Sequence, residues 1–414
     1  MNITPKSLRL QIAVFGRMNV GKSTFINTIC GQNVSITSAQ PGTTTDTVEK
    51  AMELLPLGPV LFIDTAGIDD KSEVGALRVE KTKKVFQRAD VVVVVVESEV
   101  WGEFENYIAQ NAMERKLPFI VVINKVDLKA PSENFLKLIK EKSKNYIISC
   151  ALNLEYREKL LEVFKAKLIS ICPADFLKPP PLISDLVGAG SLAVMVVPID
   201  LEAPRGRLIL PQVQTIRETL DSDAMCLVVK ERELSFALSS INIKPSIVIC
   251  DSQVVLKMIA DVPKDIKCTT FSILFARFKG NLSEMVRGAA VLGKLKHRDK
   301  ILIAESCTHH PLEDDIGRIK IPCWIKQYTG MSVEKDHSCG MNYPENLSQY
   351  KLIVHCGGCM LNRAQMLSRI QQAHASGVAI TNYGLCISFV QGVIERVLEP
   401  FPEALEAYCK SKFD

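Results

Sequence analysis

The sequence lacks any apolar run long enough to span a membrane. Its longest apolar stretches, VVVVVV at 91–96 and LAVMVVPI at 192–199, are far shorter than the ~20 residues that a spanning helix needs. The opening residues MNITPKSL also lack the apolar centre of a secretory signal peptide. We therefore expect a cytoplasmic protein with no membrane segment, and we interpret both apolar stretches as buried strands.

The sequence also lacks a basic arm and a low-complexity tract. Its 50 Lys and Arg against 46 Asp and Glu give a formal net charge of +4 that is spread along the chain, which argues against nucleic acid and membrane surfaces as partners. With 47% hydrophobic residues the chain has enough apolar side chains for a large core. The 13 cysteines are odd in number, and thiols stay reduced in the cytoplasm, so we expect no disulfide framework.

The first positive feature of the sequence is a long alternation of expected strands and helices. From Leu8 to about Lys167, apolar strands alternate with amphipathic helices, which predicts a doubly wound, mainly parallel sheet. The segment CPADFLKPPPL at 172–182 contains three consecutive prolines and predicts a stiff, extended linker. The strands expected before it are LQIAVF, LFID at 61–64, VVVVVV, FIVVIN at 119–124 and YIIS at 146–149.

The same alternation resumes after the linker, so the whole chain is expected to be α/β. We predict a first domain at 1–170, the linker at 171–182, and two smaller α/β domains at 183–265 and 266–414, although no linker marks the last boundary. The strands expected here are LAVMVVPI, AMCLVV at 224–229, SIVICD at 246–251, FSILFA at 271–276, ILIAES at 301–306, LIVHC at 352–356 and VAITN at 378–382.

The segment GRMNVGKS at 16–23 matches the phosphate-binding loop of nucleotide triphosphatases. It follows an expected strand and opens an expected helix, so its main-chain N–H groups can surround phosphates. Lys22 would reach the outer phosphates and Ser23 would bind Mg²⁺. The nucleotide-binding residues expected in this loop are Gly16, Asn19, Val20, Gly21, Lys22, Ser23 and Thr24.

Three further motifs follow in the order found in GTPases. DTAG at 64–67 would bind Mg²⁺ and sense the γ-phosphate, NKVD at 124–127 would read the base, and SCA at 149–151 would support it. The Asp127 carboxylate can accept both the N1 and N2 protons of guanine, which adenine does not offer, so GTP is expected over ATP. Residues assigned to hydrolysis are Lys22, Ser23, Thr44, Asp64 and Gly67; those assigned to the base are Asn124, Lys125, Asp127, Ser149, Cys150 and Ala151.

The segment PGTTTD at 41–46 lies where a first switch is expected, and Thr44 would join Ser23 and Asp64 on Mg²⁺ when the γ-phosphate is present. This part of the chain resembles the TrmE and Era group of GTPases. The resemblance implies slow hydrolysis stimulated by K⁺, because Asn19 stands at the ion-binding asparagine of the group and Ile68 replaces the glutamine of Ras-like proteins. The base of hydrolysis stays open, since Gly75 falls at the aligned position and Glu73 is only near it.

The segment HCGGC at 355–359 places two thiols across a Gly-Gly turn, before a helix expected to begin near Asn362. Alone, this pattern suits a zinc half-site, a redox pair or simple packing. The segment CTHHPLEDDIG at 307–317 follows another expected strand, and ligand sites form at the carboxyl ends of parallel strands, so Cys307 could join Cys356 and Cys359. Zinc and a [4Fe-4S] cluster both suit three thiolates. Candidate fourth ligands are His309, His310, His355, Glu313 and Asp314.

The combination of a TrmE-like GTPase, a middle domain and these cysteines resembles the HydF family, the maturation GTPases of [FeFe]-hydrogenases. The resemblance implies that Cys307, Cys356 and Cys359 hold a [4Fe-4S] cluster with Asp314 or His309 as a labile fourth ligand. It also implies a homodimer that receives a diiron precursor as cargo and meets apo-hydrogenase and radical-SAM maturases. The rival is a zinc-containing GTPase acting on tRNA or the ribosome, against which stands the lack of a basic, aromatic-interleaved patch.

Overall fold

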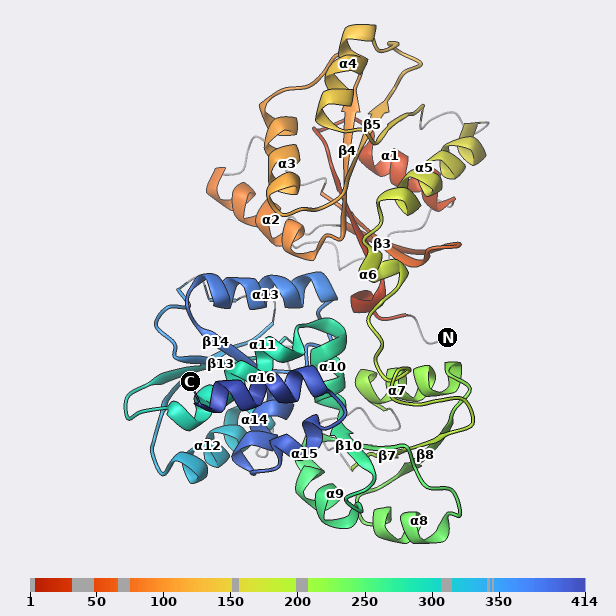
Figure 1. Cartoon of the computed structure of the whole chain (residues 1–414). Coiled ribbons are helices and arrows are strands. Elements are labelled where there is room, and N and C mark those ends of the chain that lie inside the picture. The colour runs from red at the N-terminus through yellow and green to blue at the C-terminus, as the bar shows by residue number, and fades with distance from the viewer. Residues whose placement is uncertain are drawn as a thin grey trace. The chain divides into compact units, whose positions relative to one another are not determined.

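The computed structural model describes most of the chain as two compact units, Met1–Pro179 and Pro180–Asp414 (Figure 1). The described residues are 4–31, 48–65, 75–150, 156–198, 208–306, 315–340, 343–344 and 346–413. The proline-rich segment predicted as a linker includes the point at which the two units divide.

The first unit contains a six-stranded sheet in the order β2-β3-β1-β4-β5-β6. Its strands are β1 (Leu10–Phe15), β2 (Val48–Leu54), β3 (Gly58–Asp64), β4 (Val91–Glu97), β5 (Phe119–Asn124) and β6 (Tyr146–Ile148). β2 is antiparallel to β3, and the other neighbours are parallel. The doubly wound, mainly parallel sheet predicted from the sequence is therefore confirmed.

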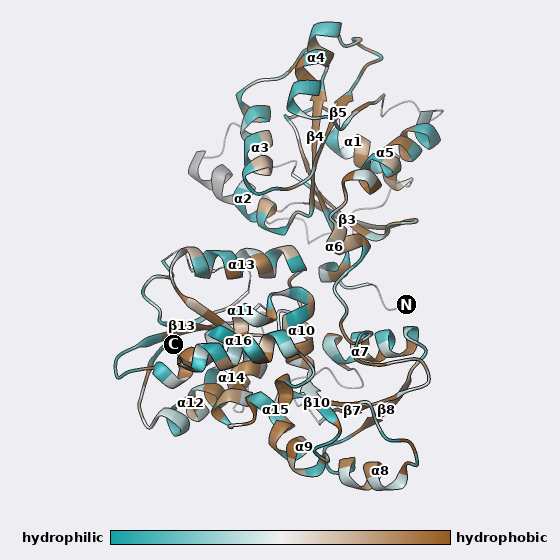
Figure 2. Ribbon diagram, viewed as in Figure 1, coloured by the Kyte–Doolittle hydropathy of each residue, from teal (hydrophilic) through white to brown (hydrophobic). Residues whose placement is uncertain are grey.

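Helices cover this sheet, and the apolar strands lie between them (Figure 2). Alternate residues of β1 show why both faces are buried: Leu10, Ile12 and Val14 belong to one core cluster, and Ala13 and Phe15 to the other. The helices are α1 (Lys22–Cys30), α2 (Gly75–Arg88), α3 (Glu103–Glu114), α4 (Glu133–Lys142), α5 (Arg157–Ile171) and α6 (Ala174–Leu177), with a short 3₁₀ turn η1 (Lys6–Leu8).

The second unit contains two four-stranded parallel sheets. The first has the order β10-β9-β7-β8 and the second β12-β11-β13-β14. The strands are β7 (Leu192–Val196), β8 (Met225–Val229), β9 (Ile247–Cys250), β10 (Lys267–Thr270), β11 (Lys300–Ala304), β12 (Glu334–Ser338), β13 (Leu352–His355) and β14 (Ala379–Asn382).

Helices follow most of these strands, as expected for parallel sheets. They are α7 (Leu210–Asp221), α8 (Leu234–Ser240), α9 (Val255–Asp261), α10 (Phe271–Lys279), α11 (Leu282–Ala290), α12 (Ile321–Thr329), α13 (Arg363–Ala375), α14 (Tyr383–Val390), α15 (Ile394–Leu398) and α16 (Pro402–Phe413). Shorter helical turns are η3 (Ser252–Val254), η4 (Val291–Lys294) and η5 (Ile316–Lys320). One hydrophobic core extends through both sheets.

One expected strand is wrong: FSILFA at 271–276 forms helix α10. The Thr270 hydroxyl accepts a hydrogen bond from the Ile273 amide at 3.2 Å, which caps the helix N-terminus. Phe271, Ile273, Leu274 and Phe275 are all buried, so the apolar run carries no helical period by which a helix could be recognised. Short β10 and polar β12 were not predicted as strands.

The predicted boundary near residue 265 falls between two strands of the same sheet. β10 begins at Lys267 and pairs in parallel with β9, so this sheet continues past that point. How the domains divide within the second unit stays a prediction.

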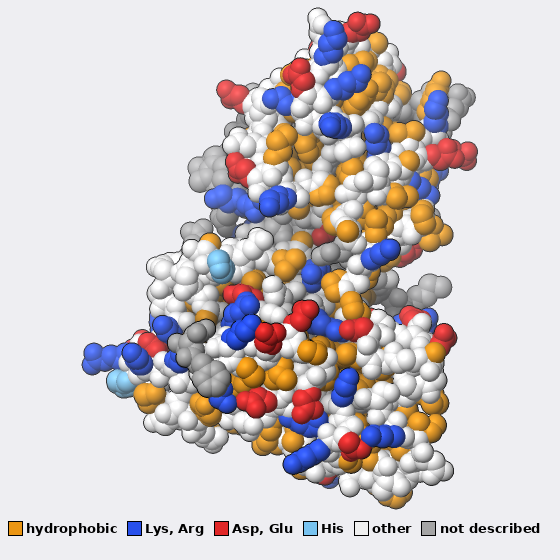
Figure 3. All heavy atoms as spheres, viewed as in Figure 1, with side chains coloured by type: hydrophobic (Ala, Val, Ile, Leu, Met, Phe, Trp, Pro, Cys, Tyr) orange, Lys and Arg blue, Asp and Glu red, His pale blue; other side chains and the backbone are white. Residues whose placement is uncertain are grey.

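The surface carries mixed charge on the face shown in Figure 3, where basic and acidic side chains lie interspersed. None of the helices in the described part of the chain combines the length and apolar character needed to cross a bilayer.

Candidate functional site

The phosphate-binding loop lies between β1 and α1, as the sequence predicted. Gly21 caps the N-terminus of α1 with φ of +91°, a left-handed conformation that residues other than glycine rarely adopt. A Cβ atom at Gly21 would lie 2.4 Å from the Asn124 side-chain nitrogen. That nitrogen donates a hydrogen bond to the Val20 carbonyl at 2.9 Å, so the base-reading motif supports the loop.

Lys22 lies buried within the loop, only 5% exposed. Its Nζ donates to the carbonyls of Gly16 and Arg17, the latter at 2.8 Å. The ammonium group therefore faces the loop main chain, where a triphosphate would be surrounded by N–H groups and the start of a helix.

Ser23 and Asp64 meet where α1 begins and β3 ends. The Ser23 hydroxyl donates to Asp64 Oδ2 at 2.6 Å. Asp64 is only 2% exposed, and its other oxygen, Oδ1, has no hydrogen-bond partner within the described residues. A buried carboxylate oxygen left over beside a hydroxyl suits Mg²⁺, which prefers oxygen ligands.

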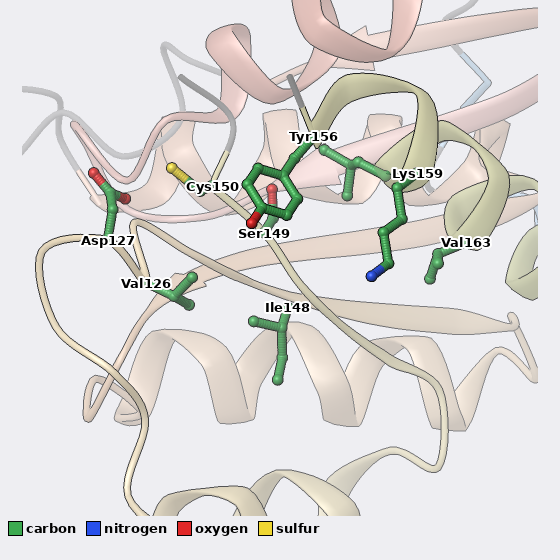
Figure 4. Close-up of a pocket in the computed structure, with 9 residues that line it drawn as sticks. Val126, Asp127, Ile148, Ser149, Cys150, Tyr156, Lys159 and Val163 are labelled. Atoms are coloured by element: carbon green, nitrogen blue, oxygen red, sulfur yellow. The ribbon is translucent and has the colours of Figure 1, made fainter. Parts of the chain in front are cut away.

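A pocket of about 390 Å³ adjoins the base-reading motif (Figure 4). Figure 4 shows Asp127 and Cys150 toward one end and Lys159 and Val163 toward the other. The Ser149 amide donates to the Ile123 carbonyl at 2.8 Å, which ties this end of β6 to β5. The pocket is lined by Val126, Asp127, Ile148, Ser149, Cys150, Tyr156, Lys159, Leu160 and Val163.

Sequence reasoning missed several residues around the nucleotide site. Tyr156 and Lys159 line the pocket from the start of α5, and no motif marks them. Arg17 forms two hydrogen bonds to Glu105, at 2.8 and 2.7 Å, and Glu105 also accepts from the Gly102 amide at 2.8 Å. Glu105 therefore fixes the phosphate-binding loop against the N-terminus of α3.

The second predicted site begins where β13 ends. Cys356 and Cys359 follow this strand, and α13 starts at Arg363 with Asn362 as its cap, so the predicted helix start is confirmed. Gly358 has φ of +62°, and a Cβ atom there would lie 2.4 Å from Met366 Cε. The loop therefore needs glycine for the left-handed conformation of its turn.

The Cys356 sulfur lies at the edge where β11 also ends. It accepts a hydrogen bond from the Ser306 amide at 3.2 Å. β11 pairs in parallel with β13, with Ala304 opposite His355, so the two strands that lead to the predicted cysteine loops are neighbours. Ser306 is the last described residue before Cys307.

His355 is fully buried and uses both ring nitrogens. Nδ1 donates to the Cys356 carbonyl at 2.7 Å, and Nε2 accepts from Arg369 at 2.7 Å. Burial, together with the Arg369 charge, lowers the pKa of His355 to about 3. The ring is thus neutral, and both of its nitrogens are hydrogen-bonded. His355 therefore orients the Cys356 main chain and has no free nitrogen to offer a metal.

A polar cluster that sequence reasoning did not assemble lies at the same sheet edge. Glu305 accepts from the Tyr383 hydroxyl at 3.1 Å and from the Cys339 thiol at 3.5 Å. Arg318 donates to the Cys339 sulfur at 3.1 Å. These residues follow β11, β12 and β14 or lie beside them, so parallel topology explains their meeting.

Lys279 is another residue that sequence reasoning missed. It ends α10, is only 2% exposed, and donates to the carbonyls of Gly358, Cys359 and Leu361. No sequence motif connects it with the cysteines, which lie about 80 positions further along the chain.

Some predicted site residues cannot be placed. In the part of the chain that the structure describes, no group of three or more His, Cys, Asp and Glu is arranged to hold a metal ion. Predicted residues outside that part are Thr44, Gly67, Ala151, Cys307, His309, His310, Glu313 and Asp314.

Three family models match the chain. The model described as 50S ribosome-binding GTPase matches residues 11–125. The hydrogen maturase F dimerization domain matches residues 182–280, and the hydrogen maturase F tetramerization domain matches residues 283–400. Together the two hydrogen maturase F models cover more than half of the chain and nearly all of the second unit.

Individual relatives each match a part of the chain. GTPase Era of Caldanaerobacter subterraneus is 28% identical over 228 residues, which are 51% of this chain and 73% of the relative. The tRNA modification GTPase MnmE of a Synechococcus species is 41% identical over 128 residues, 30% of this chain and 27% of the relative. The crystal structure of an Aquifex aeolicus Era variant bound to GDP.AlF4- is 23% identical, with a TM-score of 0.31, covering 56% of this chain and 98% of that one.

The order of the matched domains agrees with the geometry. A nucleotide-binding unit with buried Lys22, the Ser23–Asp64 pair and a pocket beside Asp127 precedes the two domains specific to hydrogen maturase F. The nucleotide-binding unit is consistent with GTP as substrate and Mg²⁺ as its metal ion. The chain is a GTP-hydrolysing enzyme, and it belongs to the hydrogen maturase F family.

Proposed function

We propose that this protein is a GTPase scaffold and carrier in [FeFe]-hydrogenase maturation. It binds a [4Fe-4S] cluster and passes a diiron precursor of the active site to apo-hydrogenase. The observation that carries the proposal is the contact between Cys356 sulfur and the Ser306 amide, at the edge where both cysteine-bearing loops leave neighbouring strands. The presence of both hydrogen maturase F domains supports it.

The donor set suits an iron–sulfur cluster. Cys307, Cys356 and Cys359 supply three thiolates, and Asp314 or His309 is the labile fourth ligand. Amide donors near sulfur, such as Ser306 N–H, stabilise anionic thiolate ligands. With one exchangeable position the cluster would supply a point of attachment for a diiron cargo.

GTP binding and hydrolysis control the exchange of partners and take no part in the iron chemistry. Lys22 acts on the phosphates, while Ser23, Asp64 and Thr44 hold Mg²⁺, so loss of the γ-phosphate releases the two segments that contain Thr44 and Gly67. Asn19 holds K⁺, which accelerates a slow intrinsic hydrolysis.

The protein acts as a homodimer joined through the middle domain. β8 ends its sheet, and Met225 and Val228 on this strand are 41% and 44% exposed. An exposed apolar edge strand can pair with the same strand of a second copy. The match to the hydrogen maturase F dimerization domain includes β8 and supports a second copy as the occupant.

A second candidate function is a zinc-containing GTPase acting on tRNA or the ribosome. It is favoured by the similarity to GTPase Era, to the tRNA modification GTPase MnmE and to the ribosome-binding GTPase model. The ribosome-binding GTPase model ends at residue 125 and so covers none of the second unit, whereas both hydrogen maturase F models lie beyond residue 181.

One experiment separates the two functions. The full chain is purified without oxygen, and its iron, sulfide and zinc are measured together with its absorption spectrum. Iron and sulfide in cluster ratio, with activation of apo-hydrogenase in a maturation assay, support the proposal. Zinc without iron would overturn it.

A further inference from the structure

Lys279 places a buried ammonium group beneath the cysteine loop. The side chain is 2% exposed, and its Nζ donates to three main-chain carbonyls: Gly358 at 3.1 Å, Cys359 at 3.2 Å and Leu361 at 2.8 Å. All three carbonyls belong to the turn between β13 and α13. A single side chain from α10 therefore holds most of that turn.

The charge of Lys279 has no carboxylate partner among the described residues, because all of its hydrogen bonds end on carbonyl oxygens. A buried charge without a counter-charge is unfavourable. Burial lowers the pKa of Lys279 to about 8. Anionic ligands held on the neighbouring cysteine loop would compensate this ammonium group.

The main chain on either side of Lys279 is also held by hydrogen bonds from α13. Arg363, the first residue of α13, donates to the Phe278 carbonyl at 2.8 Å and to the Gly280 carbonyl at 3.2 Å. These carbonyls flank Lys279 in the sequence. The end of α10 and the start of α13 therefore hold each other, and Lys279 cannot leave the loop without breaking this arrangement.

We infer that Lys279 is a positioning residue that holds the cysteine loop in its ligating shape and supplies the positive charge opposite the thiolates of the cluster. The inference rests on the proposed function. A fixed positive charge beside an anionic cluster stabilises the reduced, more negative state, so Lys279 raises the reduction potential. The sequence does not predict this role of Lys279, because the lysine contacts the cysteine loop only in the folded chain.

Three variants separate charge, hydrogen bonding and general effects. Lys279→Met removes both the charge and the donors at similar length. Lys279→Gln removes the charge but keeps amide donors. Lys294→Met is the matched control, because Lys294 is exposed and donates to one carbonyl, that of Ser411 at 3.2 Å. Thermal unfolding of each full-length variant shows whether the fold is retained.

The first measurement uses metal-free protein and does not depend on the cluster. Hydrogen exchange of residues 356–361 should be faster in Lys279→Met than in the wild type, intermediate in Lys279→Gln and unchanged in Lys294→Met. Equal exchange in all four proteins would show that Lys279 does not hold the loop.

The second measurement uses reconstituted protein. In both Lys279 variants the midpoint potential of the cluster should become more negative, and iron should be lost to a chelator about tenfold faster or more. An unchanged potential would overturn the role of the charge. If the wild type takes up zinc and no iron, the proposed function and the charge role both fall, while hydrogen exchange still decides whether Lys279 holds the loop.

Discussion

The Ser23 hydroxyl donates to Asp64 at 2.6 Å, which joins the first residues of α1 to the last residue of β3. Only one Asp64 oxygen is used in this bond, and the other is buried without a partner in the described part of the chain. Two motifs 41 positions apart thus meet at one point, where Mg²⁺ would bridge the loop and the phosphates.

The first prediction concerns the choice of base. Asp127 lines the pocket of Figure 4, where its carboxylate would accept two protons of guanine. Asp127→Asn replaces one acceptor with a donor, so GTP turnover should fall by roughly 10²-fold while xanthosine triphosphate is used in its place. Steady-state hydrolysis of both nucleotides measures this. A variant that hydrolyses GTP as well as the wild type would refute the assignment.

The second prediction concerns the monovalent ion. If Asn19 holds K⁺, hydrolysis should be faster in K⁺ than in Na⁺ at equal ionic strength, because a cation of the right size adds positive charge beside the phosphates. Asn19→Ala should remove the difference between the two salts. Equal wild-type rates in KCl and NaCl would reject the potassium site.

The third prediction is that the two sites are chemically separable. Lys22→Ala should lower GTP turnover by on the order of 10²-fold or more while the protein still reconstitutes its cluster. Cys356→Ser should lose or destabilise the cluster and leave GTP hydrolysis nearly intact, because a hydroxyl is a poorer iron ligand than a thiolate. Both variants should fail to activate apo-hydrogenase.

Iron content and GTPase rate, measured on each purified variant, decide this third prediction. Full iron and full maturation activity in Cys356→Ser would remove Cys356 from the site. Linkage requires any coupling between nucleotide and partner binding to be reciprocal in free energy, so partner affinity measured with GTP and with GDP would show how strongly the sites communicate.

The fourth prediction uses two glycines with nearly the same φ. Gly21 and Gly58 have φ of +91° and +93°, but a Cβ atom meets Asn124 at 2.4 Å at Gly21 and nothing within 4 Å at Gly58. Both Ala variants should lose on the order of 1–3 kcal/mol of stability from backbone strain. Only Gly21→Ala should also weaken GTP binding, measured with a fluorescent nucleotide. Equal GTP affinities in the two variants would contradict the contact with Asn124.

The fifth prediction tests the dimer. Val228→Asp places a charge on the exposed edge strand β8 and should weaken self-association at least about tenfold. Leu256→Asp is the control, because Leu256 is 51% exposed on α9, away from that edge. Sedimentation over a range of concentrations measures both. Dissociation of both variants, or of neither, would argue against β8 as the interface.

The nucleotide site could be read largely from the sequence because its parts are short and local. The loop from Gly16 to Ser23 is continuous, and its neighbours in the chain are the strand and helix that shape it. Asn124 is the last residue of β5 and Asp127 follows three positions later, so their position at the strand end needs only the local alternation of apolar and polar residues. The same locality made the start of α13 at Asn362 predictable.

Only the tertiary structure decided what surrounds the cysteines. FSILFA forms a helix without a helical period in its sequence, because the core surrounds it on nearly all sides and a buried helix and a buried strand then have the same apolar pattern. Lys279 donates to the Cys359 carbonyl, 80 positions along the chain, and Arg369 of α13 donates to the His355 ring. Such contacts follow from how strands pair and helices pack, and no local pattern encodes them. The sequence by itself thus determined which residues are predicted to carry the chemistry, while folding decided which buried charges and hydrogen bonds surround those that the structure describes.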